Sequence, residues 1–313
     1  MNSAPPLVAV VIPAFRASRF VGAAVKSVLA QTHARLRLVV VDDGSDDGTG
    51  DVAEAAAGDD PRVTILRRKN GGVATARNEG FAAADVDADY CAFLDADDVW
   101  TPDALTVLLA AAARRPDGVG AYGLATLVDA ASAPMPDSAF LAAQRLRRRY
   151  EHGRVRALRN DEPSDFGAFL TGCNAFTPGV VLVRAPAFRS GGGFARAAEP
   201  TEDWDMWVRL TRKAGFGFAD RIVLHHRRHD ANVSCDEAAM RRSRLRLGVR
   251  WSTLPEFTDA ERAAAAASGS ANQRYLARVR ATQAKEALAT ARIGESLMYL
   301  GRAADHFRRS LRP

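Results

Sequence analysis

Short apolar runs alternate with segments of helical periodicity in the first 115 residues, and this alternation limits the fold more than any other feature. Leu7–Ile12 and Leu36–Val41 are continuous runs of apolar, mostly β-branched residues, as in strands buried on both faces of a parallel sheet. Arg62–Leu66 and Tyr90–Leu94 predict two more strands. Since a helical segment follows each strand, we predict a doubly wound, mainly parallel α/β sheet flanked by helices.

The ends of these strands carry residues that stop a ladder. Pro13 is expected to end the first strand, because proline cannot donate to a neighbouring strand. Asp42-Asp43-Gly44-Ser45 follows the second strand and Asp95-Ala96-Asp97-Asp98 the fourth. In doubly wound sheets ligands bind beyond the carboxyl ends of the strands, so the two acidic clusters mark a predicted site.

The alternation weakens after about residue 130. Residues 137–160 are basic and predict a helix plus a loop, and Val180–Val183 and Ile222–His225 predict short strands. Glu202–Ala214 predicts a helix. From residue 236 the chain is rich in Ala and Arg and predicts helices without a clear apolar stripe.

We therefore expect an α/β domain over residues 1–235 and a helical extension over residues 236–313. Within the domain, residues 1–130 are assigned to the ligand-binding half and residues 131–235 to the half that completes the site. The formal net charge is +6, and residues 236–313 carry 15 Lys and Arg against 8 Asp and Glu. Such an extension either packs on the domain as a solvated helical layer or attracts an anionic partner.

Composition excludes several classes of protein. The chain has no run of 18 apolar residues, and its first residues lack the basic segment of a signal peptide. Its three cysteines, Cys91, Cys173 and Cys235, are far apart and fit neither a disulfide framework nor a zinc site. These features favour a protein of the reducing cytoplasm.

The Asp95-Ala96-Asp97 cluster has the residue types of a cation site. Two carboxylates two residues apart can share Mg²⁺ or Mn²⁺, with a diphosphate completing the coordination shell. Aspartates are also common turn formers, so the pair alone is compatible with a plain turn. The apolar residues on both sides bury the segment, and buried carboxylates need a compensating charge.

Two further polar segments have both structural and functional interpretations. Glu202-Asp203-Trp204-Asp205 opens a predicted helix, where acidic residues are stabilised by the helix dipole and where a carboxylate can also serve as a general base. Asn70-Gly71-Gly72 precedes another helix, whose N-terminus favours phosphate oxygens. No phosphate-binding P-loop motif and no dinucleotide-binding glycine motif follows the first strand.

Taken in order, these segments resemble the family 2 glycosyltransferases, which use nucleotide sugars and have the GT-A fold. The resemblance covers residues 8–234 and is carried by seven stretches, which are Val8–Phe15, Ser27–Thr32, Val40–Thr49, Gly72–Asn78, Phe93–Asp98, Glu202–Trp207 and Arg227–Ser234.

The resemblance implies a donor pocket. Asp43 would meet the nucleotide base, and Pro13, Ala14 and Phe15 would line the pocket around it. Arg77 would lie near the base or the diphosphate. UDP and dTDP sugars are the favoured donors.

The resemblance also implies the catalytic groups. Asp95 would face the ribose and a divalent metal, Mn²⁺ or Mg²⁺, and Asp97 would bind the metal directly. His229 is a further candidate ligand of the metal or the diphosphate. Asp203 would act as the catalytic base of an inverting, single-displacement transfer. Arg16 stands where an Asn is usual, which leaves the details of the base pocket open.

The implied partners are a nucleotide-sugar donor and a glycan, lipid-linked or small-molecule acceptor. A nucleic-acid partner is not expected, because the basic segments lack interleaved aromatic residues. The alternatives are a sugar-phosphate nucleotidyltransferase and a binding protein without catalysis. For the extension we prefer packing on the catalytic domain over contact with the inner membrane face. The oligomeric state is not predicted.

Overall fold

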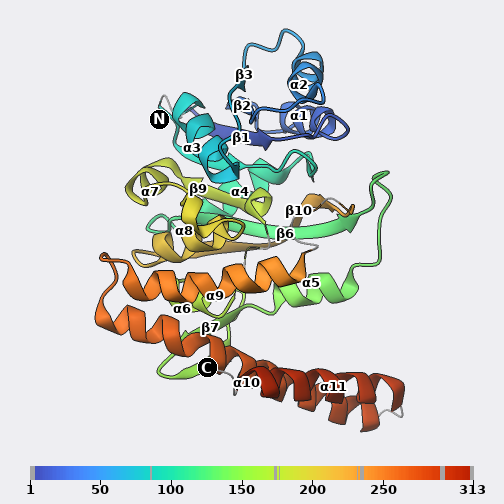
Figure 1. The fold of residues 1–313 in the computed structure, drawn as a ribbon, viewed down its shortest axis with the longest axis vertical. Coiled ribbons are helices and arrows are strands. Elements are labelled where there is room, and N and C mark those ends of the chain that lie inside the picture. Colours follow the sequence, from blue (N-terminus) through green and yellow to red (C-terminus); the bar gives the residue numbers. More distant parts are fainter. Residues whose placement is uncertain are drawn as a thin grey trace.

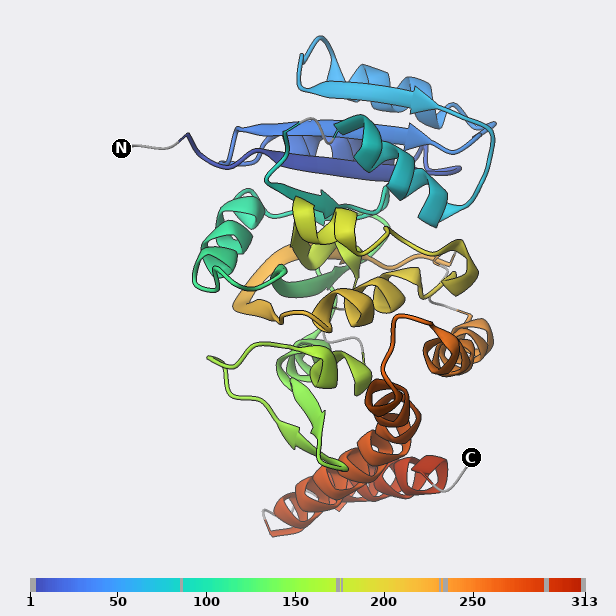
Figure 2. The same cartoon turned by 90° about the vertical axis from the view of Figure 1, so that its left-hand side faces the viewer.

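The computed structural model describes residues 4–84, 87–172, 175, 177–230, 232, 236–289 and 293–310. Its centre is one eight-stranded sheet with the strand order β3-β2-β1-β4-β9-β6-β10-β5 (Figures 1 and 2). All strands except β9 and β5 run in the same direction, which confirms the doubly wound, mainly parallel sheet. The strands are β1 (Val8–Ala14), β2 (Leu36–Asp42), β3 (Val63–Arg67), β4 (Tyr90–Phe93), β5 (Val99–Trp100), β6 (Gly120–Val128), β9 (Val181–Arg184) and β10 (Phe216–Arg227).

The first half of the sheet follows the predicted alternation closely. The helices α1 (Val21–Leu29) and α2 (Thr49–Ala57) pack together beside β1–β3. The helix α3 (Val73–Ala84) packs against β1 and β2 from the opposite face (Figure 1). This arrangement brings the carboxyl ends of β1, β2 and β4 to one edge of the sheet.

The end of β1 differs from the prediction. The strand does not stop at Pro13 but continues to Ala14, and Pro13 pairs in register with Val41 of β2. On the other side the ladder between β1 and β4 ends at Val11, whose carbonyl oxygen accepts from Leu94 N at 3.0 Å. The nitrogen of Pro13 faces this side, because it lies two residues after Val11, so its missing N–H costs no ladder bond.

The second half of the sheet contains more strand than the sequence predicted. Residues 120–128 form β6, which we did not anticipate because Gly120 and Gly123 weaken a strand signal. A side chain at Gly123 would collide with Val223 of β10, so close packing of two strands explains the glycine. The predicted strand at Ile222–His225 is part of the longer β10.

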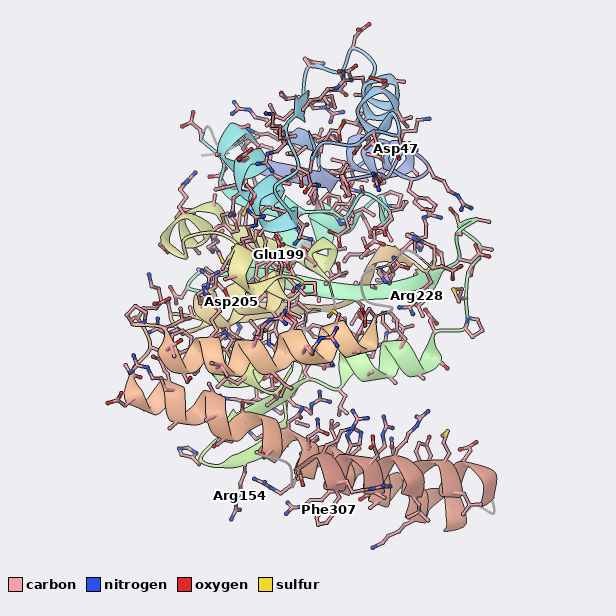
Figure 3. All side chains as sticks on the ribbon, viewed as in Figure 1. Asp47, Arg154, Glu199, Asp205, Arg228 and Phe307 are labelled. Carbon is pink, nitrogen blue, oxygen red and sulfur yellow. The ribbon has the colours of Figure 1, made fainter. Side chains whose placement is uncertain are left out.

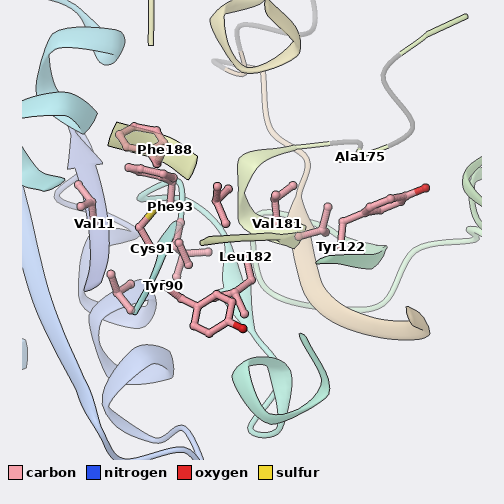
Figure 4. Packing of buried hydrophobic residues seen from close by; sticks show 14 of the residues in the cluster. Val11, Tyr90, Cys91, Phe93, Tyr122, Ala175, Val181, Leu182 and Phe188 are labelled. Carbon is pink, nitrogen blue, oxygen red and sulfur yellow. The ribbon is translucent and has the colours of Figure 1, made fainter. Parts of the chain in front are cut away.

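Helices cover this half of the sheet, and one of them, α8 (Glu202–Thr211), begins at the predicted site. They are α4 (Ala104–Ala113), α6 (Phe166–Leu170), α7 (Ala185–Ser190) and α8, which confirms the helix expected at 202–214. The core between the halves is aromatic, and Phe93 of β4 packs on Phe188 of α7 with ring centroids 5.1 Å apart (Figure 4).

The basic segment 137–160 is a helix followed by a hairpin rather than a loop. It forms α5 (Ser138–Arg145), β7 (Arg148–Glu151) and β8 (Arg154–Ala157). The turn residues His152 and Gly153 both have positive φ, 47° and 78°, as a two-residue hairpin turn of type I′ requires. The turn was not predicted from the sequence, because the first turn position of such hairpins usually holds Asn or Gly and here holds His152.

The C-terminal extension forms the predicted helices α9 (Glu237–Thr253), α10 (Asp259–Ala289) and α11 (Ile293–Ser310). Leu247, Trp251, Phe257 and Ala265 of this region are buried in the same hydrophobic core as the sheet. Across the described residues, none of the helices is both long and apolar enough to cross a membrane. Cys91 is buried in β4, whereas Cys173 and Cys235 lie outside the described residues.

Candidate functional site

The predicted site lies at the edge where β2 and β4 end. Asp43 directly follows β2, and Asp95 comes two residues after β4. Parallel strands on either side of β1 therefore deliver both acidic clusters to the same edge, as the sequence predicted. The helix α8 begins at this edge with Glu202 and Asp203.

A buried arginine joins three of these segments. The guanidinium of Arg77 on α3 donates to Asp95 Oδ1 at 2.7 Å and to Glu202 Oε1 at 2.5 Å, and it lies 5.2 Å from the ring centroid of Phe194. The side chains of Arg77 and Glu202 are only 4% and 6% exposed. Burial lowers the pKa of Arg77, but the charges of Asp95 and Glu202 outweigh it and raise this pKa above its usual value. Arg77 is thus a permanent cation between two acids.

Asp203 belongs to the same electrostatic cluster. Its Oδ1 accepts from Trp204 N at 2.7 Å. Burial and the negative charge of Glu202 raise the pKa of the Asp203 carboxyl to about 7, and Arg77 offsets this only in part. Asp95 acts on Asp203 as well, so residues 108 positions apart in the chain are close enough to influence each other. A carboxyl group with this pKa can exchange protons near neutral pH.

Asp97 lies against the chain that follows β10. Its Oδ2 is 3.0 Å from His229 Nε2 and accepts from Asn232 Nδ2 at 3.1 Å, while Arg227 Nε donates to the Asp97 carbonyl oxygen at 2.8 Å. His229 stacks on Phe20 with ring centroids 4.8 Å apart. Burial and the charge of Asp95 raise the pKa of Asp97, although the hydrogen bond from His229 opposes the shift.

The third acid of this turn has a structural role. Asp98 is fully buried and accepts from Arg227 N at 2.9 Å and contacts His226 Nδ1 at 3.1 Å. Burial raises the pKa of Asp98 to about 6. These contacts of Asp98 hold the 95–98 turn against β10. They thereby orient Asp95 and Asp97, which lie in the same turn.

The side chains of Asp95, Asp97 and His229 have the chemistry of ligands for a divalent cation. Within the described part of the chain, no three acidic, histidine or cysteine side chains already form a complete metal cage. Asp95 and Asp97 nevertheless repel each other, and the imidazole of His229 contacts Asp97. Two carboxylates and one imidazole suit Mn²⁺ or Mg²⁺ when ligand oxygens complete the shell.

Asp43 lies in a separate group of contacts. Its carboxylate accepts from Gly71 N at 3.0 Å and from Gly72 N at 2.9 Å, and it pairs with Arg68 Nη1 at 2.5 Å. The carbonyl oxygen of Ala14 accepts from Asp43 N at 2.8 Å, so β1 and β2 meet at this residue. Asp43 therefore holds the turn that leads into α3.

The other residues predicted for the donor pocket lie beside Asp43. Pro13 and Ala14 are buried at the end of β1, and Phe15 follows with 48% of its surface exposed. Arg16, the departure from the family pattern, lies 5.3 Å from the Phe15 ring centroid and pairs with Asp46 at 2.9 Å. An exposed aromatic ring at the carboxyl edge of a sheet is suited to contact a planar base.

Three contacts of the site escaped sequence reasoning. Glu202 pairs with Arg77, and Thr177 Oγ1 donates to Asp95 Oδ2 at 3.2 Å. Glu199, labelled in Figure 3, accepts from Ala74 N at 2.9 Å and so caps α3. Each contact joins residues 82 to 125 positions apart, which no local pattern reveals. In the segment Arg227–Ser234, residues 231 and 233–234 lie outside the described residues.

Comparison with known proteins shows which family the chain resembles. The family model "Glycosyl transferase family 2" matches residues 9–172. An uncharacterized glycosyltransferase of Rickettsia felis is 25% identical over 268 residues, which are 83% of this chain and 40% of that protein. The putative teichuronic acid biosynthesis glycosyltransferase TuaG of Bacillus subtilis is 38% identical over 106 residues, 34% of this chain and 41% of that protein. The chain thus spans less than half the length of these two relatives.

Solved structures share the fold at low sequence identity. TarS 1-349 of S. aureus in complex with UDP-GlcNAc has a TM-score of 0.59 and 13% identity, and the match covers 96% of this chain and 81% of that one. The mannosyltransferase PcManGT of Pyrobaculum calidifontis, in complex with GDP-Man and Mn²⁺, has a TM-score of 0.56 and 16% identity, with 99% and 89% covered. These likenesses confirm a GT-A-like fold.

Proposed function

Because the chain belongs to glycosyl transferase family 2, we propose that it moves a sugar from a nucleoside diphosphate sugar to an acceptor hydroxyl with inversion of the anomeric carbon. UDP and dTDP sugars are the proposed donors. The observation that carries the proposal is the cluster in which Asp203 and Asp95 lie around the buried guanidinium of Arg77. The family match disfavours the two alternatives, a sugar-phosphate nucleotidyltransferase and a binding protein without catalysis.

In the proposed reaction Asp203 is the general base. The acceptor hydroxyl loses its proton as its oxygen attacks the anomeric carbon, and one carboxylate within hydrogen-bond reach is sufficient. The pKa of about 7 supports this role, because such a group is largely ionised at slightly alkaline pH and still basic enough to take a proton. Arg77 holds Glu202 and so fixes the first turn of α8, on which Asp203 is mounted.

At the other end of the reaction the diphosphate leaves. Asp95, Asp97 and His229 are the residues proposed to hold a divalent cation, which when bound would supply charge neutralisation for the leaving diphosphate. Asp43, Pro13, Ala14 and Phe15 are proposed to receive the nucleotide base. The bound donors and Mn²⁺ in the complexes of TarS and PcManGT support this arrangement by analogy of fold.

The acceptor is proposed to be a glycan or glycoconjugate of the cell envelope, free or lipid-linked. The names of relatives support polysaccharide synthesis, such as TuaG and the succinoglycan biosynthesis protein ExoW of Rhizobium meliloti. We place the protein in the cytoplasm, with the basic helices of the extension as the part that would meet the inner membrane face.

Replacement of the base tests the proposal. Asp203→Asn should lower the turnover number of sugar transfer at least about 100-fold and leave donor affinity nearly unchanged, since the base acts on the acceptor. Asp59→Asn, an exposed acid between α2 and β3, is the matched control and should retain full activity. Product release from a panel of nucleotide sugars with Mn²⁺ is the assay. Turnover of Asp203→Asn near that of the control would remove Asp203 from the mechanism.

The metal site is tested by calorimetry. Asp97→Ala should lose the Mn²⁺-dependent part of UDP binding, whereas Asp59→Ala should keep it. If the unmodified protein binds UDP with equal affinity in Mn²⁺ and in chelator, the proposed cation site is wrong.

A further inference from the structure

The acidic segment that opens α8 contains a third carboxylate, Asp205, which the proposed reaction does not use. Asp205 is fully buried. Successive residues of an α-helix lie about 100° apart around its axis, so Asp205 points almost opposite to Asp203, two residues earlier. Asp203 belongs to the cluster around Arg77, whereas Asp205 contacts α9, the first helix of the C-terminal extension. Figure 3 labels Asp205 where α8 and α9 come together.

The Asp205 carboxylate accepts hydrogen bonds from its own helix and from α9. Its Oδ1 accepts from Arg250 Nε at 3.0 Å and from Trp251 Nε1 at 3.1 Å. Its Oδ2 accepts from Arg209 Nε, one turn later in α8, at 2.9 Å. A buried carboxylate is costly unless cations and N–H groups complete it, so the position of Asp205 is tied to these donors.

The same helix also contacts the residues that lead into α8. Ser243 Oγ lies 2.7 Å from Thr201 Oγ1, and both side chains are buried. Arg246 Nη2 donates to the carbonyl oxygen of Glu199 at 3.1 Å. Thr201 directly precedes α8, and its carbonyl oxygen accepts from Asp205 N at 3.1 Å. The helix α9 therefore holds both the entry into α8 and the first turn of α8.

One face of α9 makes these contacts. Ser243, Leu247 and Trp251 are buried and stand four residues apart, whereas residues 244–246 between them are exposed. Side chains four residues apart lie on the same face of a helix. The ring of Trp251 meets that of Trp204 edge-on, with ring centroids 5.6 Å apart. The inner face of α9 thus packs on Trp204, the residue next to Asp203.

The first turn of α8 is held from two sides. On the side of the site Arg77 pairs with Glu202, and on the other side Arg250 pairs with Asp205. Asp203 stands between these two anchored residues. The base must lie within hydrogen-bond reach of the acceptor hydroxyl, and a misplacement of about 1 Å can cost about 100-fold in rate.

We propose that α9 belongs to the catalytic unit and that Arg250 and Trp251 are positioning residues, which hold the base Asp203 in place through Asp205. The role of Asp203 as the base rests on the proposed function, whereas the contact of α9 with the first turn of α8 does not. The catalytic unit then extends beyond residue 235. The extension is required for sugar transfer itself, and not only for contact with a partner.

The other end of α8 offers a matched control. Arg212, the C-cap residue of α8, pairs with Glu261 of α10 at 2.8 Å, and both side chains are 20% exposed. Arg250→Met and Arg212→Met each remove one ion pair between α8 and the extension. Only Arg250 contacts the turn that carries Asp203, so a purely stabilising role predicts similar effects of the two changes.

Steady-state kinetics on the full chain test the positioning role. Arg250→Met should lower the kcat of sugar transfer about tenfold or more and leave the KM for the donor within about twofold, since the base acts on the acceptor. Arg212→Met should keep both constants. Circular dichroism at the assay temperature gives the folded fraction, by which kcat is corrected. Trp251→Phe keeps a buried ring and removes the indole N–H; it should lower kcat about threefold or more and gives the answer if Arg250→Met is unfolded.

Amide hydrogen exchange supplies a second measurement that needs no sugar transfer. The amides of residues 205–208 report on the hydrogen bonds of the first turn of α8. Exchange there should be about tenfold faster in Arg250→Met than in the unmodified protein, and unchanged in Arg212→Met.

The outcomes separate this inference from the proposed function. Equal losses of kcat in Arg250→Met and Arg212→Met, or unchanged kcat in both Arg250→Met and Trp251→Phe, would overturn the positioning role. Unchanged exchange at residues 205–208 in Arg250→Met would show that α9 does not hold the first turn. Unmodified turnover in Asp203→Asn would instead refute the base, and hydrogen exchange would still decide whether α9 holds the turn.

Discussion

Replacing Arg77 by methionine tests whether one buried cation holds the two halves of the site together. The change removes the guanidinium that donates to Asp95 and Glu202 and leaves a side chain of similar length. Asp95 is 29% exposed and can be solvated, but Glu202 is only 6% exposed. The main expected effect is therefore an uncompensated charge on Glu202.

The size of the effect follows from this burial. Removing one partner of a buried ion pair costs about 3–5 kcal/mol of unfolding free energy. With an m-value of about 3 kcal/mol per molar urea, the unfolding midpoint of Arg77→Met should fall by about 1–1.7 M. The matched control is Arg67→Met, whose pair with Asp51 is 49% and 77% exposed and should be worth less than about 1 kcal/mol.

A second substitution identifies the cause. In Arg77→Met/Glu202→Gln the buried side chain at position 202 carries no charge, so the double variant should recover most of the stability lost through Glu202. The deficit of the single variant should also shrink as the pH falls. Burial raises the pKa of Glu202 in the folded protein, and a protonated Glu202 needs no cation. A loss below about 1 kcal/mol in Arg77→Met, or a double variant no more stable than the single one, would refute the reasoning.

Two further predictions concern the base and the turn into α3. The kcat/KM for sugar transfer should fall as the pH drops through about 7. Asp203 must be ionised to accept a proton, and burial raises its pKa to about 7. A pH profile of kcat/KM that is flat between pH 6 and 8 would contradict the role of Asp203 as the base. Gly72→Ala should cost about 1–3 kcal/mol more in urea unfolding than Gly48→Ala. Both glycines have positive φ, 91° and 81°, but a Cβ at Gly72 would lie 2.9 Å from the Glu199 carboxylate and one at Gly48 would meet nothing within 4 Å. Equal losses of unfolding free energy in the two variants would show that the Glu199 carboxylate does not clash with a Cβ at position 72.

The part of the fold that the sequence predicted is the part with strong local patterns. The apolar runs at β1, β2 and β4 are buried strands as expected, and α3 begins directly after Asn70-Gly71-Gly72 as predicted. The strand β6 was missed, because its glycines are explained only by the approach of a distant strand. The β7–β8 hairpin was missed because its turn places a histidine at positive φ.

Amino-acid order by itself determined which residues stand at the strand ends, because chain direction and side-chain periodicity are local properties. It therefore indicated Asp43, Asp95 and Asp97 and, through the family resemblance, Asp203. Only the tertiary structure decided which charges face each other. Arg77 meets Glu202 across 125 positions, and α10 packs on both strands of the β7–β8 hairpin. Such pairings depend on how the sheet twists and how helices pack on it, and their energies come from burial, which no stretch of sequence specifies alone.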